Sequence, residues 1–391
     1  MEVIVHRGTH QIGGCVTEIK SKKGTRIVID IGSNLPSMRD DEEYEKTEID
    51  LAGLTNYEKP LFDAVLVTHY HGDHIGLFNK ILPEIPIYIG EISKEIFKRV
   101  QTRLVEIKKA PKEDLEIIKR FITFRIPNEF YIKDIKIKPI EVDHSAFNAH
   151  MFLIECDGKR LLHTGDFRLH GQRGKAVIPA LERYIGKVDC LICEGTTLSR
   201  EKESTNTEWD LQEQAKQIFK DNKSTFVLCS STNIDRIAAI HKAAIECNRL
   251  FVVCDRYQLD LLMYIDKVAR SDYYKFNGKM RVYGKDDVLE LMKKMGFVML
   301  VRANYISKHA LKEFPENKFI YSQWLNYLNK ENTRYKYLQD FVPKDYVFLH
   351  TSGHADRESI VKVCETVRPK KIIPIHSEKP EEFMNLRIRQ L

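Results

Sequence analysis

Three histidines and one aspartate stand within six residues, directly after a short apolar run. Residues 64–67 predict a buried strand, and a loop that leaves the end of a strand commonly holds ligands in α/β proteins. His69 and His71 are separated by one residue, so both imidazoles can face one metal ion. Asp73 and His74 follow a glycine turn and can serve a second ion. Neutral imidazole and carboxylate suit zinc or manganese, so the sequence predicts a metal site in this loop.

The same arrangement recurs along the chain, where residues that can bind a metal follow predicted strands: His144, Asp166, His354 and His376. A single residue of this kind is more often a turn residue than a ligand. Several in one chain favour a two-metal site, which needs many ligands and a carboxylate that bridges the ions. Two further acids, Asp30 and Glu194, also end predicted strands.

Composition limits the class of protein. The chain has 391 residues, a net charge of +6, 43% hydrophobic residues and 10% aromatic residues, which suffices for one large domain or two. The eight cysteines lack paired spacing apart from Cys190 and Cys193, which lie in an apolar strand and are predicted to be core residues. Without a signal-peptide pattern or an apolar run of membrane length, we expect a reduced, cytoplasmic protein with no membrane partner.

The chain reads as one domain interrupted by another. Short strands fill residues 1–199, and residues 346–391 return to that pattern with strand-end histidines. Residues 200–345 alternate helices with strands, which indicates a parallel sheet of their own. Metal-type residues flank this middle segment without entering it, so 200–345 is predicted to be an inserted α/β domain. The acidic segment 37–50 is predicted to be a solvated loop or a short helix.

Taken in order, these residues resemble the metallo-β-lactamase superfamily and, within it, the β-CASP nucleases, most closely RNase J and its bacterial and archaeal relatives. The residues that match the superfamily motifs are Asp30, His69, His71, Asp73, His74, His144 and Asp166. Those that match the additional β-CASP motifs are Glu194, His354 and His376. The resemblance implies an α/β fold, with an αββα metallo-β-lactamase sandwich and an inserted α/β β-CASP domain.

The resemblance also implies two Zn²⁺ ions per chain, with Mn²⁺ as the alternative. The implied ligands of one ion are His69, His71 and His144. Those of the other are Asp73, His74 and His376. Asp166 would bridge the ions, and Asp30 would orient the ligand loop from behind.

Catalytic roles follow from the chemistry of phosphodiester hydrolysis. Asp73 could accept a hydrogen bond from the attacking hydroxide. His354 would donate a proton to the leaving ribose oxygen, and Glu194 would keep it protonated. The alternative for His354 is a helix-cap contact. His163 and His350 are predicted to be structural.

RNA is the implied partner, single-stranded and bound near the metal site. Hydroxyl and backbone N–H groups at helix starts suit phosphate, and RNase J-like enzymes bind phosphate at places equivalent to Ser231, Thr232, Asn233, Ser352 and Gly353. Basic residues could neutralise the RNA backbone or form a solvated loop, and they are Arg168, Arg173 and Lys175.

The chain departs from RNase J in three ways. Glu194 stands where RNase J has aspartate, and Gly72 stands where the family has glutamate. Only fifteen residues follow His376, so the C-terminal domain that contributes to assembly in RNase J is not expected here. We therefore expect a short form of the family, and the sequence leaves open whether it is a homodimer.

The expected function is zinc-dependent hydrolysis of RNA, by 5′–3′ exonuclease action, endonuclease action or both, in RNA processing or decay. A β-CASP DNA nuclease is one alternative, although such proteins lack a histidine at the place of His376. A small-molecule hydrolase is disfavoured by the inserted segment. A catalytically inactive RNA-processing subunit is the last alternative, but such subunits lose ligands and none is lost here. The sequence does not separate these RNase modes or identify the RNA, the native metal or a need for a 5′-phosphate.

Overall fold

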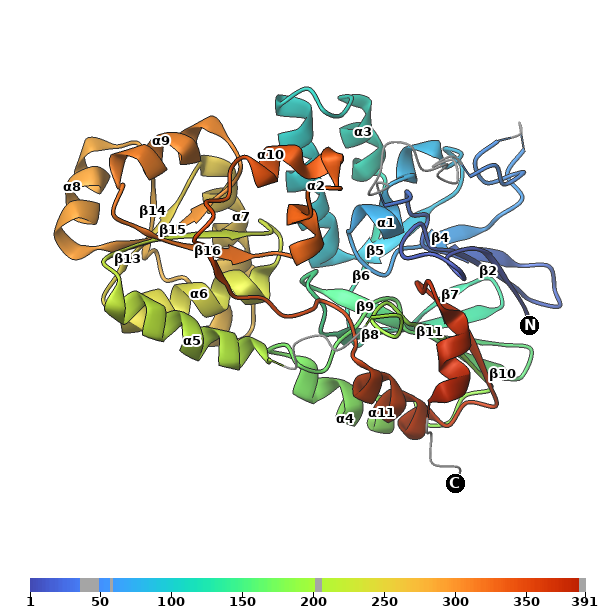
Figure 1. Ribbon diagram of the computed structural model, residues 1–391. Helices are drawn as coiled ribbons and strands as arrows, with labels where there is room; N and C mark the ends of the chain where they lie inside the picture. Colours follow the sequence, from blue (N-terminus) through green and yellow to red (C-terminus); the bar gives the residue numbers. More distant parts are fainter. Residues whose placement is uncertain (36–48, 57–58, 201–205, 387–391) are drawn as a thin grey trace. The chain divides into compact units, whose positions relative to one another are not determined.

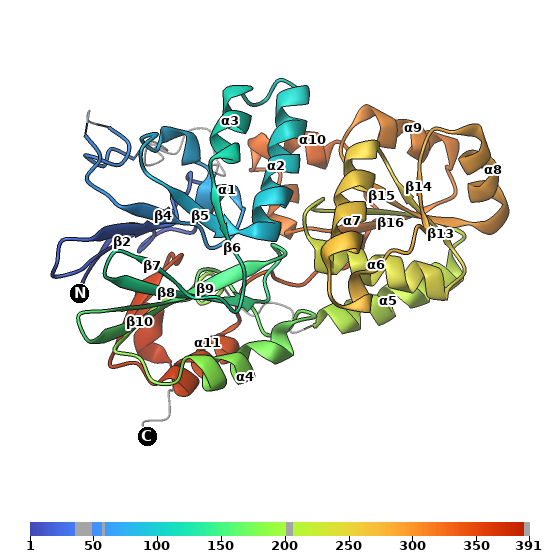
Figure 2. The ribbon, with the colours of Figure 1, turned by 180° about the vertical axis from the view of Figure 1, so that it is seen from behind.

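The computed structural model describes residues 1–35, 49–56, 59–200 and 206–386 (Figures 1 and 2). Most of the acidic segment 37–50 therefore lies outside the described residues. The chain divides into two compact units. The first unit comprises Met1–Leu35, Glu43–Glu203 and Gly353–Leu391, and the second comprises Pro36–Glu42 and Ser204–Ser352.

The first sheet of the first unit is built from the first six strands in chain order: β1 (Glu2–Arg7), β2 (Val16–Lys20), β3 (Arg26–Ile29), β4 (Ala64–Leu66), β5 (Ile87–Gly90) and β6 (Ile122–Phe124). The pairs from β1 to β3 are antiparallel, and those from β3 to β6 are parallel. Strand β4 is apolar and buried along its whole length, as expected for a strand covered on both faces. A single turn of helix, α1 (Gly72–Ile75), follows it.

The second sheet joins both ends of the chain, with the order β18-β11-β10-β9-β8-β7. Its strands are β7 (Phe130–Ile132), β8 (Ile135–Val142), β9 (Ala149–Cys156), β10 (Lys159–His163), β11 (Cys190–Glu194) and β18 (Lys371–Ile375). Strands β7 and β8 form an antiparallel hairpin, because Lys133 adopts a positive φ of 50° and turns the chain between them. The parallel pairing of β18 with β11 brings the end of the chain beside Glu194.

Helices cover the outer faces of both sheets (Figures 1 and 2). On the first sheet these are α2 (Glu91–Glu106) and α3 (Glu113–Lys119), and Phe97 of α2 contacts the rings of Phe78 and Phe121. On the second sheet α4 (Val177–Tyr184) and α11 (Arg357–Val367) lie side by side. The sequence did not indicate α4.

The main core of this unit lies between the two sheets. Ile27 and Leu66 of the first sheet belong to the same buried cluster as Phe152 and Ile192 of the second. A separate cluster packs the second sheet against α4 and α11. The layers are therefore helix, sheet, sheet, helix, which confirms the predicted αββα sandwich. Cys190 packs against the inter-sheet cluster and Cys193 against the cluster under the helices. Successive side chains of a strand point to opposite faces of the sheet, so two residues three positions apart lie on opposite faces.

The second unit is a parallel sheet with helices, which confirms the predicted βαβ alternation. Its strands are β12 (Ser224–Cys229), β13 (Leu250–Val253), β14 (Met280–Val282), β15 (Phe297–Val301), β16 (Lys318–Ser322) and β17 (Val347–Phe348), in the order β14-β13-β15-β12-β16-β17. Its helices are α5 (Glu208–Asp221), α6 (Ile234–Glu246), α7 (Arg256–Val268), α8 (Asp286–Met295), α9 (Tyr305–Glu313) and α10 (Lys336–Gln339). The 3₁₀ turns of the chain are η1 (Phe78–Lys80), η2 (Gly174–Ala176), η3 (Asp272–Tyr274), η4 (Leu325–Leu328), η5 (Thr333–Tyr335) and η6 (Pro380–Asn385).

Strand β17 corrects one expectation. The sequence places residues 346–349 with the first domain, but β17 pairs with β16 in the sheet of the second unit. Helix α9 and strand β14 were also not indicated by the sequence. No helix within the described ranges is both long and apolar enough to cross a bilayer.

Candidate metal centre

The carboxylate of Asp30 holds the loop that follows β4 in place. Its Oδ1 accepts the Thr68 N–H at 2.8 Å, and its Oδ2 accepts the Thr68 hydroxyl at 2.8 Å. The same Oδ2 lies 2.7 Å from Nδ1 of His74. Asp30 is fully buried and has a positive φ of 60°, a conformation that costs energy for a non-glycine residue and is often found at functional sites.

The first imidazole group consists of His69, His71 and His144, whose ligand atoms all lie within 4.8 Å of one another. Nε2 of His144 is 3.2 Å from Nδ1 of His71, close to the roughly 3.4 Å between two nitrogens on one tetrahedral zinc ion. Nε2 of His69 is buried and has no hydrogen-bond partner among the described residues. The three histidines expected to share one metal are therefore brought together.

Burial keeps these imidazoles neutral. It lowers the pKa of His71 to about 4 and the pKa values of His69 and His144 well below the usual range, and neighbouring histidines add to the lowering. A metal ion binds the neutral form of imidazole, so the protonation state suits ligation.

The second group contains Asp73, His74 and His376. Nε2 of His376 lies 3.1 Å from Oδ2 of Asp73, and Nε2 of His74 lies 4.0 Å from the same oxygen. The two imidazole rings are stacked with centroids 5.2 Å apart. His376 has a φ of 50°, and its N–H donates to the carbonyl of Gly8, which fixes the residue after β18.

Asp166 lies between the two groups. Its Oδ2 is 3.2 Å from His74, 3.7 Å from His144 and 3.8 Å from both His69 and His376, measured to Nε2 in each case. Both carboxylate oxygens are buried without a hydrogen-bond partner among the described residues. Burial raises the pKa of Asp166, but His376 and His74 outweigh this effect and hold it well below the usual range. A buried, ionised carboxylate surrounded by imidazoles of both groups fits a metal-bridging ligand.

His354 and Glu194 form a pair beside this centre. Nδ1 of His354 is 3.0 Å from Oε2 of Glu194 and 3.5 Å from Oδ2 of Asp166. Burial would lower the pKa of His354, but the Glu194 carboxylate raises it to about 8. Oε1 of Glu194 accepts the N–H of Phe167 at 2.7 Å, so this carboxylate is held in place.

The hydroxyl groups of two threonines, Thr68 and Thr196, contact imidazoles of the centre, and the sequence analysis did not single out either residue. Thr68 Oγ1 lies 3.0 Å from Nδ1 of His69. Thr196 Oγ1 donates to Oε2 of Glu194 at 2.6 Å and lies 2.8 Å from Nδ1 of His376. Thr68 directly precedes the motif residue His69, and Thr196 lies two residues after Glu194, so proximity to a motif is the signal that could have found them.

The residues expected to contact phosphate divide between the units. Ser231, Thr232 and Asn233 precede α6 in the second unit, where the Asn233 side chain accepts the Arg236 N–H at 3.2 Å and caps the helix. Ser352 ends the second unit, and Gly353 begins the last segment of the first. The carbonyl of Gly353 lies 2.6 Å from Nδ1 of His144, so this residue supports a ligand histidine.

The basic cluster at 168–175 is not a solvated loop throughout. Arg168 is fully buried and forms an ion pair with Asp143 at 2.7 Å. Arg173 pairs with Glu141 and stacks on Phe147. His163 is buried and its Nδ1 accepts the Gly165 N–H, which agrees with a structural role.

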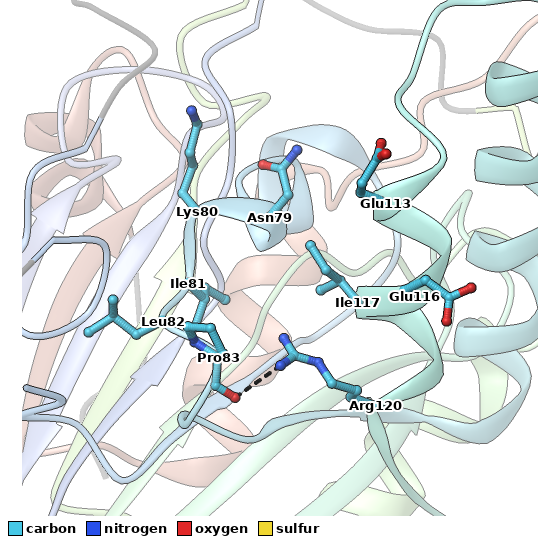
Figure 3. Close-up of a pocket in the computed structure, with 9 residues that line it drawn as sticks. All are labelled: Asn79, Lys80, Ile81, Leu82, Pro83, Glu113, Glu116, Ile117 and Arg120. Carbon is cyan, nitrogen blue, oxygen red and sulfur yellow. Dashed lines mark hydrogen bonds between the residues drawn. The ribbon is translucent and has the colours of Figure 1, made fainter. Parts of the chain in front are cut away.

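A surface hollow of about 520 Å³ lies elsewhere in the first unit, against α3 (Figure 3). It is lined by Asn79, Lys80, Ile81, Leu82, Pro83, Glu113, Glu116, Ile117 and Arg120. The Arg120 guanidinium donates to the Pro83 carbonyl across it (Figure 3). None of these residues belongs to the metal cluster.

Known proteins resemble both the sequence and the fold. Residues 47–230 match the β-lactamase superfamily domain, and residues 345–382 match the Zn-dependent metallo-hydrolase RNA specificity domain. Ribonuclease J of Helicobacter pylori is 22% identical over 95% of this chain, and Ribonuclease J of Corynebacterium glutamicum is 23% identical over 81%. The chain spans about half the length of these relatives, 55% and 45% respectively.

A crystal structure of a protein of unknown function from Enterococcus faecalis V583 has the same fold, with a TM-score of 0.76 and 23% identity over 97% of this chain and 95% of that one. The donor set of imidazoles and buried carboxylates fits a metal cofactor, and the matched domains run through the residues that supply it. The chain therefore resembles RNase J-like proteins of the metallo-β-lactamase superfamily, through a region that matches the β-lactamase superfamily domain and a second that matches the RNA specificity domain.

Proposed function

We propose that the protein is a metal-dependent ribonuclease that hydrolyses RNA phosphodiester bonds. The observation that carries the proposal is the position of Asp166, a buried carboxylate that lies 3.2–3.8 Å from imidazoles of two separate ligand groups and accepts no hydrogen bond from the described residues. The names of the relatives, Ribonuclease J in each case, support RNA as the substrate.

We assign two metal ions to the centre, zinc in the first instance and manganese as the alternative. His69, His71 and His144 would hold one ion, and Asp73, His74 and His376 the other, with Asp166 between them. When bound, such a pair polarises a phosphodiester and activates a water molecule for attack. Asp30 supports the centre by fixing Nδ1 of His74, which leaves Nε2 of that imidazole to face the ion.

Asp73 and His354 would handle the protons. The Asp73 side chain is 12% exposed, whereas that of Asp166 is 1% exposed, so Asp73 is the carboxylate that can accept a hydrogen bond from attacking water. His354 would protonate the leaving ribose oxygen through Nε2, because its Nδ1 is engaged by Glu194. Glu194 would act by keeping His354 charged at neutral pH.

RNA would be held in part by groups that suit phosphate. The Ser231, Thr232 and Asn233 turn presents hydroxyls at the start of the thirteen-residue helix α6. Ser352 and Gly353 offer a hydroxyl and backbone N–H groups next to His354. The net charge of +6 is compatible with this polyanionic partner.

The first unit would be the metallo-β-lactamase domain, and the second unit, with β17 in its sheet, would be the β-CASP domain. We place the protein in the cytoplasm, in RNA processing or decay, and a homodimer is the assembly to examine first.

The first test is metal content beside substrate choice. Protein purified without chelator should contain close to two metal equivalents by elemental analysis. The loaded protein should cleave 5′-monophosphate or 5′-triphosphate RNA in preference to DNA of matched sequence. Full activity with no metal would refute the metal mechanism, and preferential cleavage of DNA would refute the assignment of RNA.

The second test separates ligation from proton transfer with three variants. His376→Ala should lose one metal equivalent together with most turnover. His354→Ala should keep both metals while single-turnover cleavage falls by roughly 10²–10⁴-fold, the usual contribution of general acid catalysis. Glu194→Gln should show a milder loss of the same kind. His309→Ala is the control, because this histidine of the second unit is 60% exposed. If His354→Ala loses a metal or cleaves at the wild-type rate, another group is the acid.

A further inference from the structure

Cys15 lies on the loop between β1 and β2 and is held there by backbone contacts. Its N–H donates to the Asp73 carbonyl at 3.2 Å, and its own carbonyl accepts the N–H of Gly32 at 3.1 Å. The Arg7 guanidinium holds the neighbouring Gly14 carbonyl at 2.7 Å. The residue is 1% exposed, so its thiol has a fixed, buried position.

The sulfur of Cys15 lies close to two imidazoles of the second ligand group. A ligand atom of Cys15, one of His74 and one of His376 all lie within 4.8 Å of one another. On one ion, a Zn–S bond of about 2.3 Å and a Zn–N bond of about 2.1 Å place sulfur and nitrogen about 3.1 Å apart at a right angle and about 3.6 Å apart at a tetrahedral angle, and both separations fall inside that limit. Within the described part of the chain, no other cysteine is grouped in this way with metal-type residues.

Independent evidence for a ligand at this place comes from His74. Its Nδ1 is engaged by Asp30, while its fully buried Nε2 has no hydrogen-bond partner among the described residues. A buried nitrogen left without a hydrogen bond is costly unless something binds it. Among the cysteines of the described residues, Cys15 alone is grouped with this imidazole.

We propose that the Cys15 thiolate is an additional ligand of the metal ion held by Asp73, His74 and His376, and that it sets the metal preference of this position. The inference rests on the proposed metal centre. A thiolate is a softer ligand than imidazole or carboxylate, so it favours zinc or cobalt over manganese. A site made of histidines and carboxylates alone would discriminate less between zinc and manganese.

Proton release accompanies this binding. Burial raises the pKa of the Cys15 thiol far above its usual range, and although His74 lowers it, Asp166, Asp30 and Asp73 raise it further. On ligation the S–H bond breaks, the metal–sulfur bond forms and the proton leaves to solvent.

Cobalt(II) provides a direct test, because a cobalt–thiolate bond gives an intense charge-transfer absorption in the near ultraviolet that nitrogen and oxygen ligands do not give. The full chain, freed of metal and reloaded with cobalt, should bind about two equivalents and show this band. Cys15→Ser should lose the band. Cys190→Ser is the matched control, because Cys190 lies in the same unit on β11 and should keep it.

Two equivalents of cobalt in the wild-type protein without the band would overturn the role of Cys15 and leave the metal centre intact. A band that survives in Cys15→Ser would also overturn it. Failure of the wild-type protein to bind cobalt or zinc would overturn both proposals. A second measurement does not depend on the band: zinc and manganese competition should show that Cys15→Ala lowers the preference for zinc by about tenfold or more. An unchanged preference would contradict the assignment.

Discussion

At the scale of the residue, the centre is defined as much by what holds the imidazoles as by the imidazoles themselves. Asp30 fixes His74, Thr68 contacts His69, Thr196 contacts His376 and the Gly353 carbonyl contacts His144. Each of these contacts is made to Nδ1, so Nε2 is the nitrogen directed to the centre. Ligand orientation of this kind is what tunes metal affinity.

Replacement of Asp30 by asparagine tests this arrangement. Asp30→Asn keeps the shape of the side chain but removes the charge that engages Thr68 and His74 together. We expect zinc affinity to fall by roughly 10–100-fold, measured by competition with a chromophoric chelator. Asp63→Asn is the matched control, since Asp63 accepts the Arg26 N–H at 2.8 Å beside the same sheet but faces no ligand. Equal affinity in the two variants would contradict the role of Asp30.

At the scale of the element, the loops that follow β3 and β4 pack against each other through a glycine. A Cβ atom placed on Gly32 would lie 1.7 Å from the Asp73 carbonyl oxygen, so any side chain there must displace the backbone of this proposed ligand. Because the Gly32 N–H also donates to the Cys15 carbonyl, the displacement would reach that loop as well.

Gly32→Ala should therefore lower metal content while leaving the strands intact. We expect loss of about one of two metal equivalents by elemental analysis, with the far-ultraviolet circular dichroism spectrum unchanged. Gly72→Ala is a demanding control, because Gly72 lies between His71 and Asp73. Among the described residues, a Cβ atom there would meet only Ser33 Oγ, at 3.7 Å, and should be tolerated. Retention of both metals by Gly32→Ala would show that Asp73 is not positioned by this contact.

The sequence predicted the elements that carry strong local patterns and missed those fixed by tertiary context. Strand β4 and the strand-end histidines were recognisable because apolar runs and ligand residues are local features. The hairpin at Lys133 and the pairing of β17 depend on a backbone turn and on a partner strand, neither of which leaves a pattern within the segment itself. The contacts of Thr68 and Thr196 are similar, because a hydroxyl that holds an imidazole looks like any other threonine until the fold brings the two together.

At the scale of the whole molecule, the two units can be followed separately by spectroscopy. Both tryptophans of the chain, Trp209 and Trp324, lie in Ser204–Ser352, so tryptophan fluorescence reports the second unit. The proposed metal ligands all lie in the first unit. A single unfolding free energy is not well defined for a chain of two units, so a probe confined to one of them is needed.

His241 gives the second unit a specific dependence on pH. The imidazole of His241, on α6, packs edge-on against Phe251 and Phe276, and neither ring nitrogen has a hydrogen-bond partner among the described residues. Burial, aided by Lys242 and Lys279, lowers the pKa of His241 to about 4 from an unfolded value near 6.5. Between these values the unfolded chain binds more protons than the folded one, so stability is complete above about pH 6.5 and falls as the pH drops toward 4.

The His241 contribution amounts to about 2 kcal/mol of stability lost between pH 8 and pH 5, where a solvent-exposed histidine would contribute nothing. His241→Leu removes the titrating group and keeps an apolar side chain between the two phenylalanines. The quantity to measure is the difference in unfolding free energy of the second unit between pH 8 and pH 5, followed by tryptophan fluorescence in urea. We expect this difference to be smaller in His241→Leu than in the wild-type protein by about 2 kcal/mol. His309→Leu, at a position where the histidine is 60% exposed, should retain the full wild-type difference. If His241→Leu retains it too, the acid sensitivity of this unit arises from other groups.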